Sequence, residues 1–148
     1  MRYLLDTNVL LLLAREKEEG KIINEKLKLI GSENQVFFSV VSRGELFSLA
    51  RQSKWGKHRM DKLEILLSNF GEINISPAIV KKYTDIDVYS QGKEPLKPLP
   101  KGISARNMGK NDIWIAATAA ISYCTLVTTD GDFSHLKDIF INLIELKR

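Results

Sequence analysis

Short apolar runs alternate with helical patterns along this chain, and this alternation restricts the possible folds more than any other feature of the sequence. Strand-like runs are predicted at residues 2–5, 36–41, 73–75, 125–128 and 143–146. Helices are predicted between them at residues 7–19, 21–30, 60–70, 76–89 and 111–123, with a further helix opened by Ser42. Such alternation is typical of α/β proteins. We therefore predict a three-layer α/β sandwich with a mainly parallel central sheet flanked by helices.

Several helix boundaries are also predicted from single residues. Gly20 is expected to end the first helix and Gly31 the second, because glycine favours helix C-termini. Ser42 is expected to cap the third helix, with Glu45 three residues later in the position of a capping box. Residues 90–110 contain three prolines and three glycines, which predicts a long loop. Long loops in compact domains are often functional.

Length and composition exclude several classes of protein. A chain of 148 residues has the size of one domain, so residues 1–148 are predicted to form a single unit. The longest apolar run, at residues 9–14, is far shorter than the roughly 20 residues that cross a bilayer. Asp6 and Asn8 interrupt the apolar N-terminus, which argues against a signal peptide and favours the cytoplasm. One cysteine, Cys124, and two histidines cannot build a disulfide or a structural zinc site.

Positive charge is concentrated in two segments. The formal net charge is only +4, but residues 51–62 and residues 91–110 each carry five basic side chains against one acidic side chain. Clustered positive charge suits a polyanionic partner such as a nucleic acid. The alternative interpretation is a solvated, basic surface with no partner.

Five acidic residues fall where the predicted chain passes from a strand into a helix. Because parallel strands end at the same edge of a sheet, these side chains are expected to converge there. Unpaired carboxylates repel one another, so a cation would stabilise the group. Oxygen ligands favour a hard divalent ion such as Mg²⁺ or Mn²⁺. The five candidates are Asp6, Glu45, Asp112, Asp130 and Asp132.

Each acid also has an ordinary explanation. Asp6 could cap the first helix, Asp112 could interact with a helix dipole, and Asp130 could hold a turn. Local capping roles do not require all of these acids to lie at the same edge of the sheet. Because all of them are predicted there, the five acids taken together favour a shared site. Four neighbouring polar residues are candidates for orienting the acids: Thr7, Asn8, Asn111 and Thr129. Of these, Thr7 and Asn8 are expected to orient Asp6.

Four motifs resemble those of PIN-domain ribonucleases, above all VapC-type toxins of toxin-antitoxin pairs. They read Asp-Thr-Asn at 6–8, Ser-Arg-Gly-Glu-Leu at 42–46, Gly-Lys-Asn-Asp-Ile-Trp-Ile-Ala-Ala-Thr-Ala at 109–119, and Thr-Thr-Asp-Gly-Asp-Phe at 128–133. The resemblance spans essentially the whole chain. It implies a PIN-like fold, a Mg²⁺- or Mn²⁺-dependent endoribonuclease that inhibits translation, a homodimer, and an antitoxin that blocks the site. Matched by motif, the catalytic and metal-binding acids are Asp6, Glu45, Asp112 and Asp130, with Asp132 as an accessory metal ligand.

Three lysines of the second basic segment are candidate RNA contacts: Lys97, Lys101 and Lys110. His58 and His135 are predicted at the surface, and Cys124 in the core. Two other functions remain open at this stage. One is a catalytically silent PIN-like domain that binds RNA or protein. The other is a receiver-like phosphoacceptor domain, which is disfavoured because a lone Asp6, and not an acidic pair, follows the first strand.

Overall fold

The computed structural model describes residues 1–147 and contains one parallel sheet of five strands. In chain order these are β1 (Arg2–Leu5), β2 (Gln35–Ser39), β3 (Gly71–Ile73), β4 (Thr125–Thr128) and β5 (Asn142–Glu145). Their order across the sheet is β3-β2-β1-β4-β5, and all four neighbouring pairs are parallel. Each strand lies within two residues of its predicted position. The predicted parallel sheet is therefore confirmed.

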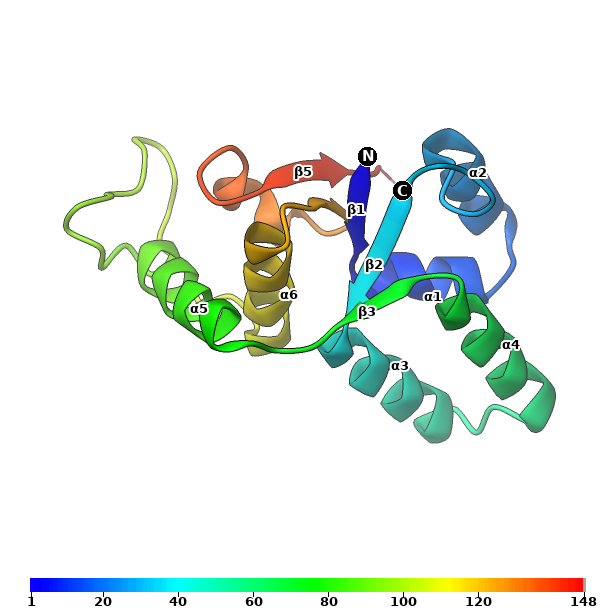
Figure 1. Cartoon of the computed structure of the whole chain (residues 1–148). Coiled ribbons are helices and arrows are strands. Elements are labelled where there is room, and N and C mark those ends of the chain that lie inside the picture. The colour runs from blue at the N-terminus through cyan, green and yellow to red at the C-terminus, as the bar shows by residue number, and fades with distance from the viewer. Residues whose placement is uncertain (148) are drawn as a thin grey trace.

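Helices cover both faces of the sheet, as Figure 1 shows. One face carries α1 (Thr7–Ala14), α2 (Glu18–Leu27), α3 (Val40–Gln52) and α4 (Lys57–Ser68). The other carries α5 (Pro77–Ser90), α6 (Lys110–Ile121) and the short 3₁₀ helix η1 (Gly131–Leu136). Alternate residues of β1 enter different cores, because Tyr3 and Leu5 face the first group of helices while Leu4 faces the second. The three-layer sandwich is confirmed.

The first predicted helix is wrong in its extent. α1 ends at Ala14, and α2 begins at Glu18, so Gly20 lies inside a helix and does not end one. Gly20 is buried, and a Cβ atom at this position would lie 2.5 Å from the carbonyl oxygen of Leu12. The glycine therefore allows α2 to pack closely on α1. α2 ends before Lys28, which adopts a left-handed conformation, and not at Gly31.

The predicted cap of α3 is also wrong. Val40 starts the helix directly after β2, and the hydroxyl of Ser39 accepts a hydrogen bond from the amide of Val41 at 3.1 Å. Ser42 is buried inside the helix. Because Ser39 is the N-cap, Glu45 lies beyond the first turn and cannot complete a capping box. The ordinary explanation for Glu45 is thereby removed.

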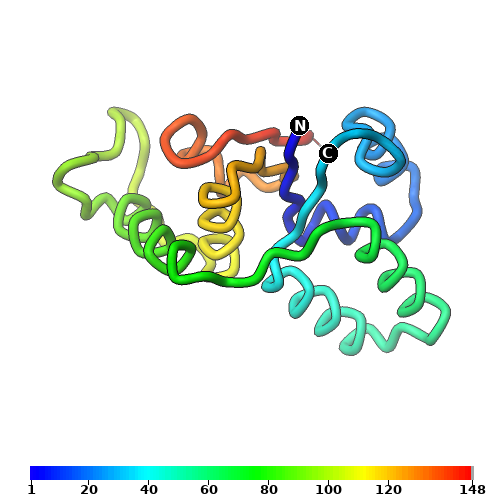
Figure 2. The backbone as a smooth tube through the Cα atoms, viewed as in Figure 1, coloured from blue at the N-terminus to red at the C-terminus, as the bar shows by residue number. Residues whose placement is uncertain are grey.

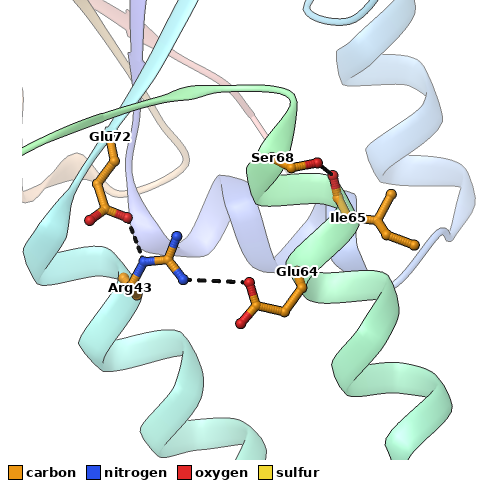
Figure 3. Close-up of polar contacts among 5 residues, drawn as sticks. All are labelled: Arg43, Glu64, Ile65, Ser68 and Glu72. Atoms are coloured by element: carbon orange, nitrogen blue, oxygen red, sulfur yellow. Dashed lines mark hydrogen bonds and ion pairs between the residues drawn. The ribbon is translucent and has the colours of Figure 1, made fainter.

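Arg43 connects α3 to β3 and α4 through its guanidinium group (Figure 3). Its Nε donates a hydrogen bond to Glu72 of β3, and a terminal nitrogen lies 3.6 Å from Glu64 of α4. The hydrogen bond to Glu72 is the main reason why the pKa of Arg43 is raised. This guanidinium is thus engaged with two carboxylates, and it fixes the helix that carries Glu45 two positions later.

Residues 91–109 form no helix or strand, which confirms the predicted loop. Figure 2 shows this segment reaching away from the sheet and returning to the start of α6. The base of the loop is closed by a hydrogen bond from the amide of Arg106 to the carbonyl of Ser90 at 2.8 Å. Within residues 1–147, no helix has the length and apolar character needed to cross a membrane.

Candidate active site

Asp6 follows β1 directly and is 3% exposed. One carboxylate oxygen accepts a hydrogen bond from the amide of Val9 at 2.9 Å, so Asp6 does cap α1. The second oxygen accepts a hydrogen bond from the hydroxyl of Thr128, at the end of β4. The predicted cap of the first helix by Asp6 is therefore confirmed, and the same carboxylate also contacts the end of the neighbouring strand.

A chain of hydrogen bonds runs from Asp6 through Thr128 to the acids that follow β4. The hydroxyl of Thr128 accepts from the amide of Asp130 at 2.9 Å, and the carboxylate of Asp130 accepts from the amide of Asp132 at 2.9 Å. The turn at Asp130 opens η1, as the ordinary interpretation of this residue expected. Thr128 was not predicted as a site residue. It reaches Asp6 because the register pairs Leu5 with Val127, and the sequence does not reveal that register.

Thr7 orients Glu45 and not Asp6, which corrects the predicted partner. Its hydroxyl lies 2.7 Å from a carboxylate oxygen of Glu45 and 2.9 Å from the hydroxyl of Ser42. A threonine hydroxyl carries one proton, so Thr7 donates to Glu45 and accepts from Ser42. This contact joins α1 to α3 across the carboxyl edge of the sheet.

The other three predicted orienting residues make no such contact. Within residues 1–147, no hydrogen bond connects Asn8, Asn111 or Thr129 to any of the five acids. Asn8 and Asn111 are exposed, and Thr129 lies half-buried against the groove between α2 and the end of β5. The structure thus brings one of the four predicted orienting residues, Thr7, into contact with an acid.

Asp112 completes the acidic group from the first turn of α6. Carboxylate oxygens of Asp112, Asp130 and Asp132 all lie within 4.8 Å of one another. Asp6 and Glu45 lie near enough to raise the pKa of Asp112 through their charges. All five predicted acids therefore share one edge of the sheet.

Burial and mutual repulsion raise the pKa values of two of these acids. Burial is the main cause that raises the pKa of Asp6 to about 6, against the opposing hydrogen bonds from Thr128 and Val9. Burial, followed by the charges of Asp130 and Glu45, likewise raises the pKa of Asp112 to about 6. Within the described chain, no lysine or arginine forms an ion pair with any of the five.

The donor set fits a hard divalent cation. Every donor in the cluster of Asp112, Asp130 and Asp132 is a carboxylate oxygen, the ligand type that Mg²⁺ and Mn²⁺ prefer. The repulsion that raises the pKa of Asp112 is the repulsion that a bound cation would remove.

His135 is buried and not at the surface, so its predicted position is wrong. It lies in η1, where its Nε2 is 2.7 Å from the hydroxyl oxygen of Ser90 at the end of α5. Burial, reinforced by the charge of Arg106, lowers the pKa of His135 to about 4, so the ring is neutral at neutral pH. The other two predictions of this kind are confirmed, because His58 is exposed and Cys124 is buried.

Replacement of Ser90 by alanine tests this buried contact. We expect Ser90→Ala to lower the free energy of unfolding by about 1–2 kcal/mol, because it leaves a buried ring nitrogen without its partner. Urea unfolding measures the change. Ser134→Ala, which removes an exposed serine hydroxyl of η1, is the control. Equal stability of Ser90→Ala and the wild type would show that the contact contributes nothing.

The three candidate RNA-binding lysines occupy different places. Lys110 begins α6, two positions before Asp112. Lys97 lies in the long loop with its ammonium 4.8 Å from the centroid of the Phe140 ring, and Phe140 precedes β5. Lys97 is therefore near the amino edge of the sheet, whereas the acids lie at the carboxyl edge. Lys101 is exposed in the same loop.

Fold and site together define an α/β domain with a carboxylate cluster at the carboxyl edge of a parallel sheet. This chain belongs to the PIN domain family, because the PIN domain model matches residues 3–139. No curated protein matches the sequence closely enough to count as a relative.

Solved structures with the same fold include several toxin-antitoxin proteins. VapBC2 from Rickettsia felis, bound to a DNA fragment from its promoter, matches at a TM-score of 0.75 and 22% identity, over 99% of this chain and 100% of that chain. VapBC-1 from nontypeable Haemophilus influenzae matches at a TM-score of 0.74 and 23% identity, over 98% of both chains. Mycobacterium tuberculosis VapC20, described as a Sarcin-Ricin loop cleaving toxin, matches at a TM-score of 0.63 and 14% identity, over 99% of both chains. These likenesses show the shared fold.

Proposed function

We propose that this protein is a metal-dependent endoribonuclease that hydrolyses phosphodiester bonds in RNA. The observation that carries the proposal is the convergence of carboxylate oxygens from Asp112, Asp130 and Asp132 within 4.8 Å, without a basic partner in residues 1–147. Membership of the PIN domain family supports it. A carboxylate cluster of this kind repels the phosphodiester placed next to it unless a cation neutralises the carboxylates, which ties cleavage at this site to binding of a metal.

Five acids would hold Mg²⁺ or Mn²⁺ and form the catalytic centre: Asp6, Glu45, Asp112, Asp130 and Asp132. When bound, such an ion supplies positive charge to the phosphate oxygens and lowers the pKa of a water molecule. Thr128 and Thr7 fix the carboxylates of Asp6 and Glu45 by donating hydrogen bonds to them. Lys110, beside Asp112 at the start of α6, would contact the RNA backbone, and Lys97 and Lys101 would extend that contact along the loop.

The biological role we propose is that of a toxin in a toxin-antitoxin pair, acting in the cytoplasm to inhibit translation. The fold is shared with a toxin-antitoxin complex from Klebsiella pneumoniae at a TM-score of 0.64, and with VapC20, described as a Sarcin-Ricin loop cleaving toxin. The partners would be a cognate antitoxin protein and a second copy of this chain.

The two alternative functions have less support. A receiver-like domain needs a carboxylate that is free to accept a phosphoryl group, but both oxygens of Asp6 accept hydrogen bonds inside the protein. A catalytically silent domain has no need of acids whose pKa values are raised by burial and by the charges of neighbouring acids, as that of Asp112 is.

Cleavage of a mixed pool of structured RNA tests the proposal. The purified protein is incubated with Mg²⁺, Mn²⁺ or EDTA, and the products are resolved by gel electrophoresis. We expect cuts with either metal and none in EDTA, because the carboxylates alone cannot neutralise a phosphodiester. Cleavage that persists in EDTA would contradict the metal-dependent chemistry, and absence of cleavage with either metal would favour a silent binding domain.

A further inference from the structure

A cleft of about 350 Å³ lies beside the acidic cluster. It is lined by Asp132 and by the last residues of the long loop, among which Arg106 is the cation: Ser104, Ala105, Arg106, Asn107 and Met108. Asp132 belongs both to this cleft and to the group of carboxylates within 4.8 Å of one another. Through Asp132 the cleft therefore borders the proposed metal site.

The backbone around Arg106 is fixed relative to Asp132. The amide of Arg106 donates a hydrogen bond to the carbonyl of Ser90 at 2.8 Å. The hydroxyl of Ser90 lies 2.7 Å from Nε2 of His135 and 3.4 Å from the sulfur of Met108. His135 is three positions after Asp132, in the same short helix. One buried set of contacts thus holds the loop end and the acidic turn together.

The side chain of Arg106 is half-buried and has no anionic partner. Within residues 1–147, no carboxylate lies at ion-pair distance from it, and its guanidinium donates no hydrogen bond. Arg43 differs, because it is engaged with both Glu64 and Glu72 (Figure 3). A half-buried guanidinium loses hydration without compensation, and it has the geometry to bind phosphate oxygens with two parallel hydrogen bonds.

We propose that Arg106 binds a backbone phosphate of the RNA strand in this cleft, next to the phosphodiester held at the acids. The inference rests on the proposed function for the identity of the substrate. It locates the principal cation at the end of the loop, whereas Lys97 lies at the far edge of the sheet against Phe140. Arg106 is then the contact that aligns the strand with the carboxylates.

Binding and cleavage are measured separately to test this assignment. The affinity of a labelled single-stranded RNA oligonucleotide is determined by fluorescence anisotropy in EDTA at several salt concentrations, and kcat and KM are determined with Mn²⁺. Arg106→Gln and Arg106→Lys are compared with the wild type. Lys93→Gln is the matched control, because it removes the same charge from an exposed position of the same loop to which no RNA contact is assigned.

We expect Arg106→Gln to weaken RNA binding roughly tenfold, as loss of a charge-assisted hydrogen bond does. The dependence of log Kd on log salt should fall by about 0.7, the value for one phosphate contact on a single strand. Arg106→Lys should restore the salt dependence but only part of the affinity, because lysine cannot bind with two parallel hydrogen bonds. KM should rise more than kcat falls.

Three outcomes would overturn the inference. Equal losses of affinity for Arg106→Gln and Lys93→Gln would mean that Arg106 contributes only general surface charge, even if the wild type cleaves RNA. Failure of the wild type to bind the oligonucleotide would exclude the contact. A loss seen with RNA but not with single-stranded DNA of the same sequence would place Arg106 on the ribose. Failure of the proposed function is distinguishable, because it appears as absent cleavage by the wild type while the binding comparison still stands.

Discussion

Asp112→Asn is expected to lower the rate of metal-dependent RNA cleavage by about a thousandfold while the protein stays folded. The substitution removes one negative charge from the cluster of Asp112, Asp130 and Asp132 with almost no change in volume. A divalent ion contributes several kcal/mol of transition-state stabilisation, and each 1.4 kcal/mol or so corresponds to a tenfold change in rate. If Asp112 holds the metal, its loss should therefore lower the rate by about three factors of ten.

The matched control is Asp138→Asn. Asp138 is exposed and adopts a left-handed backbone with φ of 62°, a conformation that asparagine accepts as readily as aspartate. It precedes β5 and so lies at the amino edge of the sheet, opposite the acidic cluster. The control therefore makes the same change of charge where no metal is proposed.

Cleavage rates with Mn²⁺, binding of Mn²⁺ by calorimetry, and circular dichroism are measured for both variants. Asp138→Asn should match the wild type in all three. Asp112→Asn should keep the circular dichroism spectrum and lose both metal binding and cleavage. Undiminished cleavage by folded Asp112→Asn would remove this residue from the catalytic group.

The location of the acids was predictable because it depends on connectivity alone. In a parallel sheet every strand ends at the same edge, so the position of Asp6 after β1 and of Asp130 after β4 is sufficient to bring them together. No knowledge of side-chain packing is required. The fold class was predictable for the same reason, since alternation of strands and helices leaves few arrangements.

Residues with two possible uses were the ones that the sequence misplaced. Gly20 is as suitable for ending a helix as for letting two helices approach closely, and only the packing of α2 on α1 selects the second use. Ser39 and Ser42 are both good N-caps, and the helix begins at the first of them because β2 ends there. Local propensity cannot distinguish such cases.

Contacts between distant segments were also beyond the sequence. Thr128 reaches Asp6 through the register of β4 on β1, and Thr7 reaches Glu45 through the packing of α1 on α3. His135 was predicted at the surface because its sequence position did not suggest an acid-base pair with His58, yet Ser90 supplies a partner 45 positions away. In each case the position of the side chain is set by a hydrogen bond that forms only in the folded chain.

The buried carboxylate of Asp6 carries a cost in stability that depends on pH. Its pKa is about 6 in the folded protein, against an ordinary value of 3.8. Between these values the folded state retains a proton that the unfolded state has lost, so the free energy of unfolding falls as pH rises from about 4 to about 6. At neutral pH the full penalty is present, with a ceiling of about 3 kcal/mol.

Asp6→Asn should therefore make the metal-free protein more stable at neutral pH, by about 2 kcal/mol once some weakening of the hydrogen bond with Thr128 is allowed for. Urea unfolding in EDTA, for the wild type and the variant across this pH range, measures the difference. His135 changes stability in an overlapping pH range with the opposite sign, but it is present in both proteins and cancels in the comparison.

The advantage of Asp6→Asn should disappear near pH 4, where the wild-type carboxyl group is protonated in both states. It should also shrink or reverse when Mn²⁺ is added, because an ion that binds only the folded state stabilises the wild type more than a variant with one ligand fewer. A variant that is less stable than the wild type at neutral pH in EDTA would contradict this account. Asp6 would then act mainly as the cap of α1. The cost in stability of the metal-free acidic cluster would then come from Asp112 and its neighbours.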